Sequence, residues 1–270
     1  MSTKTRNATH VMIVTFASTM LALGMSSGAP SGAAAGETEA KALVKTMSDY
    51  MAKQKSVSFA YDTSLEVVTK ERQKLLLASS GTMDIARPDK IRAIRSGGFA
   101  NVEITFDGKT LTLLSKDNNL YVQFEVPGTI DHLIDELRDK YHRPVPGADL
   151  ILSNVYDELM RDVVDVKDLG SGVIGGTECD HLAFRTKEVD WQIWIAQGEH
   201  PYPCRYVITS TQVEQGPQYS FQISDWKSAT DLTPKDFSFK APTDAKRVDD
   251  PKQLVDIDEL PDNFVVGDTK

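Results

Sequence analysis

The stretch NVEITFDGKTLTLLSKDNNLYVQFEVPGTIDHLIDELRDKY, residues 101–141, determines how this chain is expected to fold. Its first part alternates apolar with polar residues in short runs, and Asp107-Gly108 supplies a tight-turn signal between two of them. From Thr129 onward the apolar residues recur every three or four positions, which is the period of a helix with one apolar face. The stretch therefore predicts a meander of antiparallel strands, followed by a helix that can cover a curved sheet.

The sequence on both sides repeats this combination of strands and covering helices. A helix with one apolar face is predicted over Glu37–Lys53, and about six strands follow it in the first half of the chain. A second helix is predicted near Asp149, after which strands resume at Val163 and continue to Asp225. We therefore expect an α+β fold that is mainly antiparallel β, with α-helices that cover the sheet.

Residues 1–35 have the pattern of an export signal. Lys4 and Arg6 precede an apolar core, and small residues end at Ala35. A membrane anchor is the alternative interpretation, but the apolar run is short for a bilayer span and is interrupted by hydroxyl residues. We expect a signal peptide that is cleaved near Ala35, a periplasmic location, a domain over 36–243 and an acidic tail over 244–270. The tail is apolar enough for part of it to dock on the domain or on a partner.

The composition narrows the class of partner. The formal net charge is −9, and removal of the signal takes away two positive charges and no negative ones, so the mature chain is more acidic still. An acidic chain without a basic cluster argues against binding to nucleic acid and against electrostatic docking on anionic lipid. The mature part also contains no apolar stretch that is long enough to form a transmembrane segment.

Two cysteines, Cys179 and Cys204, flank a predicted pair of strands in the exported part of the chain. Because the periplasm permits oxidation, we expect them to form a disulfide. In the loop-entropy model such a bond would stabilise the fold by about 3 kcal/mol. The alternative is a pair of buried free thiols.

Catalytic and metal-binding motifs are weak. Gly108-Lys109-Thr110 is similar to the end of a phosphate-binding loop, but it lies in the predicted hairpin turn and lacks the upstream glycine. Asp180 and His181 are the most enzyme-like pair, although neighbours on a strand point to opposite faces. His132 and His142 do not have a metal-ligand spacing. We therefore predict no catalytic residue, no metal site and no cofactor.

Four segments resemble a family of predicted periplasmic proteins of unknown function, which is grouped with the LolA/LolB-like lipoprotein carriers. These segments are 106–111, 121–131, 179–184 and 190–195. The resemblance covers roughly Glu37 to Phe239. It implies a LolA-like curved, unclosed β-barrel of about 11 strands, with helices on its concave side and an apolar hollow between helices and sheet.

On this basis we predict a non-enzymatic binding protein that holds a hydrophobic small molecule, a lipid or an acyl chain, in the hollow. Burial of about 0.8 kcal/mol per methylene would supply the affinity. The predicted wall residues are Phe59, Tyr61, Leu65, Leu77, Phe106 and Val122, and the predicted lid residues are Ile130, Leu133 and Leu137.

Two alternatives remain open. The inward rows can be plain core, in which case the chain is an envelope signalling or assembly module that acts through protein contacts of its acidic surface and tail. An envelope enzyme is the third possibility, and His181 is its best catalytic candidate.

Overall fold

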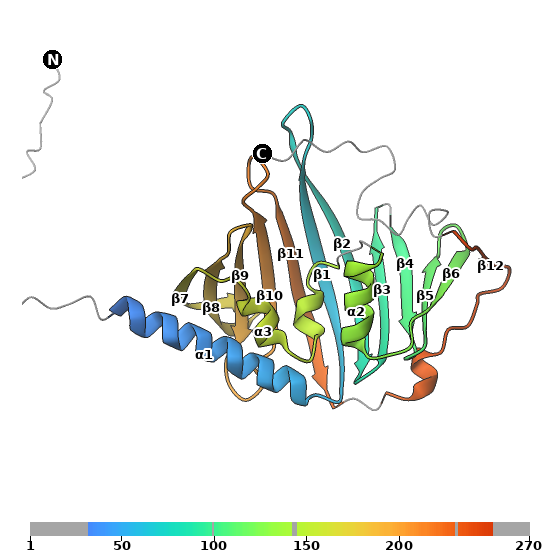
Figure 1. Cartoon of the computed structure of the whole chain (residues 1–270), viewed down its shortest axis with the longest axis horizontal. Helices are drawn as coiled ribbons and strands as arrows, with labels where there is room; N and C mark the ends of the chain where they lie inside the picture. The colour runs from blue at the N-terminus through green and yellow to red at the C-terminus, as the bar shows by residue number, and fades with distance from the viewer. Residues whose placement is uncertain (1–31, 99, 142–144, 230–231, 251–270) are drawn as a thin grey trace, which may run out of the picture.

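The computed structural model describes residues 32–98, 100–141, 145–229 and 232–250 (Figure 1). Helix α1 (Gly32–Lys53) precedes six strands in the first half of the chain. These are β1 (Ser56–Val68), β2 (Lys74–Ala86), β3 (Lys90–Gly97), β4 (Asn101–Phe106), β5 (Thr110–Ser115) and β6 (Leu120–Glu125).

Two short helices and a 3-10 turn connect this half to the second. They are α2 (Ile130–Asp139), η1 (Ala148–Ile151) and α3 (Val155–Met160). The later strands are β7 (Asp165–Ile174), β8 (Thr177–Arg185), β9 (Val189–Ala196), β10 (Pro203–Ser210) and β11 (Gln218–Ser228). A 3-10 turn η2 (Pro234–Phe237) and a short strand β12 (Lys246–Arg247) follow.

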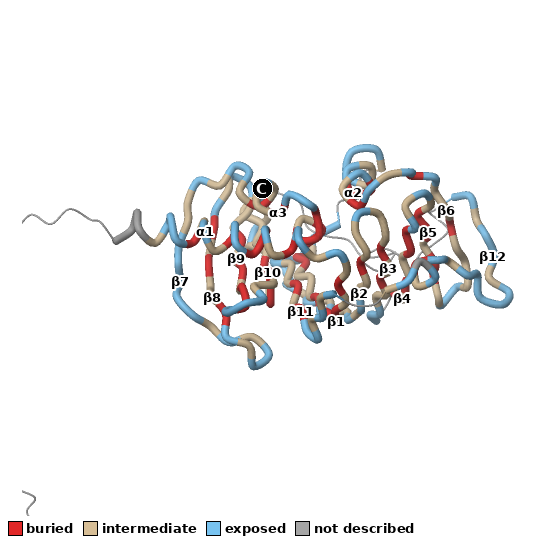
Figure 2. The backbone as a smooth tube through the Cα atoms, turned by 90° about the horizontal axis from the view of Figure 1, so that it is seen from below, coloured by how far each residue is buried: buried red, intermediate tan, exposed pale blue. Residues whose placement is uncertain are grey.

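All the strands in the described residues belong to one 12-stranded sheet, in the order β12-β6-β5-β4-β3-β2-β1-β11-β10-β9-β8-β7. Neighbouring strands are antiparallel except for β12 and β6. Because β12 and β7 form opposite ends of the order, the sheet is unclosed, and the helices lie on one side of it (Figures 1 and 2). The predicted fold, a curved, unclosed and mainly antiparallel sheet with covering helices, is confirmed, with twelve strands in place of about eleven.

Helix α2 forms where the sequence predicts it, and its first turn is capped. The Thr129 hydroxyl accepts a hydrogen bond from the backbone N–H of His132 at 3.2 Å, which satisfies one of the free donors at the helix start. Asp131 adds a favourable negative charge to this end. Ile130 and Leu133 then point to the sheet, and only 1% and 2% of their surfaces are exposed.

The main core lies between the helices and the concave face of the sheet (Figure 2). Helix α1 contributes four buried residues at helical spacing, Ala40, Val44, Met47 and Met51. The strands contribute alternate residues such as Phe59, Ile85 and Phe106, which belong to the same cluster. The alternation that predicted the strands therefore also predicts which of their faces is buried.

Gly81 allows an aromatic ring to lie against strand β2. A Cβ atom at this position would lie 2.5 Å from Cζ of Tyr61 and 2.0 Å from the carbonyl oxygen of Ile94. The Tyr61 hydroxyl donates to that same carbonyl at 3.1 Å. Glycine is required here because the ring crosses the backbone of β2, and any side chain would collide with both groups.

The predicted disulfide between Cys179 and Cys204 is wrong for this structure, because both residues are free and buried thiols. Cys179 lies on β8 and Cys204 on β10, with Ala196 of β9 in the same small cluster. The two thiols lie close enough to affect each other's pKa, but they are not bonded to each other. Burial raises the pKa of both thiols, so they stay protonated.

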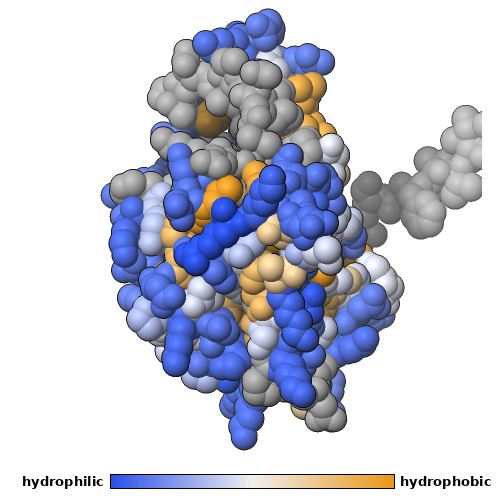
Figure 3. Space-filling model, turned by 90° about the vertical axis from the view of Figure 1, so that its right-hand side faces the viewer, coloured by the Kyte–Doolittle hydropathy of each residue, from blue (hydrophilic) through white to orange (hydrophobic). Residues whose placement is uncertain are grey.

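The end of the chain covers part of the convex face, near β4–β6. Phe237 of η2 is fully buried, and the rings of Phe239 and Tyr121 lie 5.0 Å apart. A depression of about 160 Å³ remains between this segment and the hydroxyls of Thr105 and Thr112, which is small for a ligand pocket. This end of the molecule exposes hydrophobic residues among mainly hydrophilic ones (Figure 3).

Candidate apolar binding face

The predicted wall and lid residues divide into two groups. Five of them, Phe59, Tyr61, Phe106, Ile130 and Leu133, are buried in the main core cluster, and Leu137 packs against that cluster. Val122 is also buried, with 2% of its surface exposed. Leu65 and Leu77 are only half-buried and are not part of the cluster. The sheet residues of the first group are therefore packed beneath the helices, whereas Leu65 and Leu77 are not.

A row of apolar side chains crosses seven neighbouring strands on the concave face, and we call it the apolar row. Each member is the direct register partner of the next, so all the side chains project from the same face. From β2 to β7 its members are Leu77, Leu65, Tyr219, Ile208, Trp191, Phe184 and Val166. Six strand spacings make the row about 29 Å long.

One part of the apolar row is closed. Phe184 and Trp191 are each 3% exposed, and their rings stack at 3.9 Å with an angle of 11° between the planes. Both belong to the main core cluster together with Leu159 of α3 and Leu150 of η1. This part of the row is therefore core.

The other part of the apolar row is open. Leu77, Leu65, Tyr219 and Ile208 are all half-buried. Leu75, which lies two residues before Leu77 on the same face of β2, is half-buried as well. We call these five residues the open patch. A half-buried apolar surface on the concave side of a sheet is suited to an apolar ligand, because binding removes the rest of that surface from water.

A short polar band separates the open patch from the main core on β1 and β2. Thr63 and Ser79 are register partners, and their hydroxyl oxygens are 2.7 Å apart, so each side chain has a hydrogen-bond partner. Gly97 of β3 continues this row opposite Ser79. The band consists of small residues and therefore gives the open patch little lateral packing, which explains why Leu65 and Leu77 stay outside the core cluster.

Sequence reasoning did not predict Tyr219, Ile208 or the aromatic pair Phe184 and Trp191 as members of the apolar row. The signal was present, because Trp191, Ile193 and Ile195 alternate on β9 in the same way as the residues of β1. Two ring residues beside the predicted wall residue Phe59 were also missed, Trp226 and Tyr50. Phe59 stacks on Trp226 at 5.6 Å, and the indole N–H of Trp226 donates to the Tyr50 hydroxyl at 3.2 Å.

Two titratable groups lie beneath the helices. Asp149 of η1 is half-buried, and burial raises the pKa of its carboxyl group, with a further contribution from the negative charge of Glu158. Tyr206 of β10 is 4% exposed, and burial also raises the pKa of its phenol, to which Asp149 adds. In both groups burial disfavours the charged form relative to the same group in water.

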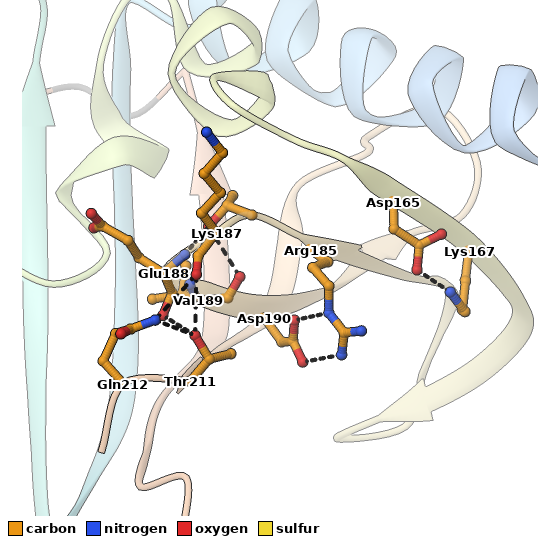
Figure 4. Close-up of polar contacts among 10 residues, drawn as sticks. Asp165, Lys167, Arg185, Lys187, Glu188, Val189, Asp190, Thr211 and Gln212 are labelled. Atoms are coloured by element: carbon orange, nitrogen blue, oxygen red, sulfur yellow. Dashed lines mark hydrogen bonds and ion pairs between the residues drawn. The ribbon is translucent and has the colours of Figure 1, made fainter. Parts of the chain in front are cut away.

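Polar contacts fix the strand ends beside the closed part of the row (Figure 4). The Arg185 guanidinium donates two hydrogen bonds to the Asp190 carboxylate, at 2.6 and 2.7 Å, and these residues are register partners on β8 and β9. The pair lowers the pKa of Asp190. The Thr211 hydroxyl donates to the carbonyl of Glu188 at 2.6 Å, which ties the β8–β9 turn to the β10–β11 loop.

The best catalytic candidate is engaged in structural contacts. Nε2 of His181 lies 2.9 Å from Oε1 of Gln192, and its ring stacks on Trp194 with the centroids 4.0 Å apart. The Asp180 carboxylate accepts a hydrogen bond from Gln197 at 2.7 Å and does not orient the imidazole. Within the described part of the chain, no cluster of three or more His, Cys, Asp or Glu side chains is arranged to hold a metal ion.

Residues 40–249 match the family described as "Predicted periplasmic protein (DUF2092)", and the match covers more than half of the chain. It confirms the resemblance of the sequence to a predicted periplasmic family. A comparison with curated proteins found no match. Of the helices that the structure describes, none is both long and apolar enough to span a membrane.

Several solved structures have a related arrangement. The Mycobacterium tuberculosis lipoprotein LppX is 14% identical, over 73% of this chain and 100% of that chain, with a TM-score of 0.46. The Pseudomonas aeruginosa MucA/MucB complex gives 13% identity, coverage of 75% and 62%, and a TM-score of 0.44. A LolA superfamily protein from Nitrosomonas europaea gives 11%, coverage of 74% and 97%, and 0.35. These similarities do not bear on the ligand or the partner of this chain.

Proposed function

We propose that this chain, which belongs to the family of predicted periplasmic proteins (DUF2092), binds an apolar ligand of the acyl-chain type on the open patch of the apolar row. The single observation that supports this function is the open patch, where an apolar row that is core at Trp191 and Phe184 becomes half-buried toward β1 and β2. The proposal includes export to the periplasm, with cleavage near Ala35, and a role without catalysis. The alternative role, as an envelope signalling or assembly module, stays a prediction.

The affinity would come from burial of apolar surface. Each methylene that is fully buried contributes about 0.8 kcal/mol, so a chain of about 15 methylenes contributes about 12 kcal/mol. An association cost of about 4 kcal/mol then leaves about 8 kcal/mol, which corresponds to micromolar affinity. The row offers aliphatic side chains at Leu65 and Leu77 and the edge of an aromatic ring at Tyr219. The shape and length of the ligand would determine how well it binds to such a face, and the ligand would not need a charged group.

A pair of charged substitutions tests this function. Leu65→Glu with Leu77→Glu places two carboxylates in the open patch, and we expect the double variant to lose binding of the fluorescent fatty acid cis-parinaric acid. Lipids extracted from the purified variant should also decrease relative to those from the unsubstituted protein, because a charged wall repels an acyl chain.

The matched control is Leu76→Glu. Leu76 lies on the same strand but on the opposite face, and 62% of its surface is exposed, so this variant should bind as the unsubstituted protein does. Circular dichroism verifies that both variants are folded. An unsubstituted protein that neither binds the fatty acid nor co-purifies with an apolar molecule would refute the proposed function.

A further inference from the structure

A second row of register partners crosses the convex face of the sheet, and we call it the convex row. Each member is the direct register partner of the next, so all the side chains project from the side opposite to the open patch. From β2 to β8 its members are Ser80, Asp62, Gln222, Arg205, Trp194 and His181. All six residues are half-buried or exposed, so the row is accessible at the surface.

Arg205 is the cation of the convex row, and it forms no ion pair with any residue that the structure describes. Its Nε atom is buried without a hydrogen-bond partner there, and its Cζ atom lies 5.7 Å from the centre of the Trp194 ring. Arg185 on the same face, by contrast, binds the carboxylate of Asp190. A guanidinium that is half-buried and unpaired is costly, because it loses water without gaining an anion. Arg205 can therefore bind a carboxylate from outside the chain.

Trp194 is held in place beside this cation. The His181 ring stacks on it with the centroids 4.0 Å apart and an angle of 13° between the planes. On β7 a Cβ atom at Gly172 would lie 3.2 Å from Nε1 of Trp194, so the glycine leaves room for the indole. The β8–β10 half of the convex row therefore presents large planar groups.

The other half of the convex row is small and carries the opposite charge. Ser80 and Asp62 are both exposed, and the Asp62 carboxylate accepts a hydrogen bond from the Ser80 hydroxyl. With His181 neutral, Asp62 and Arg205 are the two charged residues of the row, and two strand spacings of about 10 Å separate them. A chain with a net charge of −9 thus has a row on which the charges balance.

A two-fold axis along β11 makes the convex row complementary to itself. When two copies pack convex face to convex face about this axis, each residue of β10 meets the residue of β1 at the same height in the other copy. Arg205 then faces Asp62 of the partner subunit, and the large Trp194 faces the small Ser80 of the partner subunit. Gln222 lies on the axis, where two side-chain amides can donate to and accept from each other.

We propose that the convex row is the interface of a homodimer, in which Arg205 and Asp62 form an ion pair with their counterparts on a second copy of this chain. An unrelated anion would satisfy Arg205 alone, whereas a second copy satisfies both charged residues. Two acidic chains repel each other over most of their surfaces, and the balanced row lets them approach with little repulsion. The open patch lies on the other face, so the dimer does not depend on the proposed function.

Analytical ultracentrifugation of the mature chain over a concentration series tests the dimer. We expect a monomer–dimer equilibrium in the unsubstituted chain. Asp62→Arg places like charges opposite each other at two symmetric positions, as does Arg205→Asp, so each should raise the dimer dissociation constant by about 100-fold or more. Asp157→Arg is the matched control, because it makes the same change in charge on α3, on the concave side, and should leave the dimer unchanged.

An equimolar mixture of the two variants tests the two-fold arrangement. In the mixed pair the retained Arg205 faces the retained Asp62, and the introduced arginine faces the introduced aspartate, so both contacts join opposite charges. We expect each variant alone to be monomeric and the mixture to dimerise as the unsubstituted chain does. Circular dichroism verifies that both variants are folded.

Three outcomes would overturn the proposal. The first is an unsubstituted chain that stays monomeric over the whole concentration series. The second is a dimer that both variants retain, because a different surface would then form the interface. The third is a mixture of folded variants that stays monomeric, since a two-fold contact between Arg205 and Asp62 requires the mixed pair to form.

Discussion

Strands β1 and β2 carry two apolar zones on the same face, and the two zones differ in how deeply they are buried. Near one end, Phe59 and Ile85 are 3% and 1% exposed and belong to the main core. Toward the hairpin tip, Leu65 and Leu77 are register partners on the same face and are only half-buried. Both zones project from the same face of the two strands. The helices pack on the first zone, so they determine which part of that face joins the main core.

The polar band between the zones makes this difference sharper. The Thr63 and Ser79 hydroxyls form a hydrogen bond with each other. Because they are polar, they interrupt the apolar surface that would otherwise continue along β1. Substitutions in the two zones should consequently have separate effects, one on stability and the other on binding. Residues that share no contacts usually give additive effects.

The largest effect on stability is expected in the covered zone. Phe106 is fully buried in the main core, and Phe106→Ala should lower the free energy of unfolding by about 3–5 kcal/mol, since it removes buried surface and leaves a cavity. Urea denaturation measures this change. Leu76→Ala, on the exposed convex side, should change the same quantity by less than about 0.5 kcal/mol. Equal losses in the two variants would show that the covered zone is not a packed core.

Much of the fold can be predicted because its signals are local. The turn at Asp107-Gly108 and the alternation around it specify a hairpin, and Thr129 caps the helix that follows. The pairing of β1 with β11 has no comparable signal, because Leu65 and Tyr219 meet only after the whole chain has folded. The cysteine prediction was wrong for the same reason: compartment and spacing do not reveal whether the sulfur atoms of Cys179 and Cys204 reach bonding distance in the folded chain.

The candidate site could be predicted only in part. Leu65 and Leu77 were predicted as wall residues together with Phe106 and Val122, because each lies in a row of alternate residues that was expected to face inward. Alternation cannot distinguish a wall that a helix covers from one that remains half-buried. That distinction depends on where α2 ends and on how far β1 and β2 extend beyond it, which are properties of the assembled sheet.

A smaller effect on stability is expected in the open zone, with a larger effect on binding. Leu77 is half-buried, so Leu77→Ala removes less surface from the interior and should cost about 1 kcal/mol in the free energy of unfolding. The same variant should bind cis-parinaric acid more weakly, because its side chain belongs to the open patch. Urea denaturation and a fluorescence titration measure the two quantities. A loss of stability as large as that of Phe106→Ala would place Leu77 in the core and remove the contrast between the zones.

The smallest effect on stability is expected at a third region, the 3-10 turn η1 that packs on the second half of the sheet. This effect depends on pH. Burial raises the pKa of Asp149 above the value of about 3.9 that it has in the unfolded chain. Folding then favours the protonated carboxyl group, so its contribution to stability is complete below about pH 3.9 and is lost as the pH rises through the folded pKa. Asparagine does not titrate, and Asp149→Asn should therefore increase the melting temperature at neutral pH and make no difference at pH 3. Melting curves of both proteins from pH 3 to 8 test this. A constant difference over that range would mean that η1 leaves Asp149 in contact with water, and the second half of the sheet would then be open like the patch around Leu65.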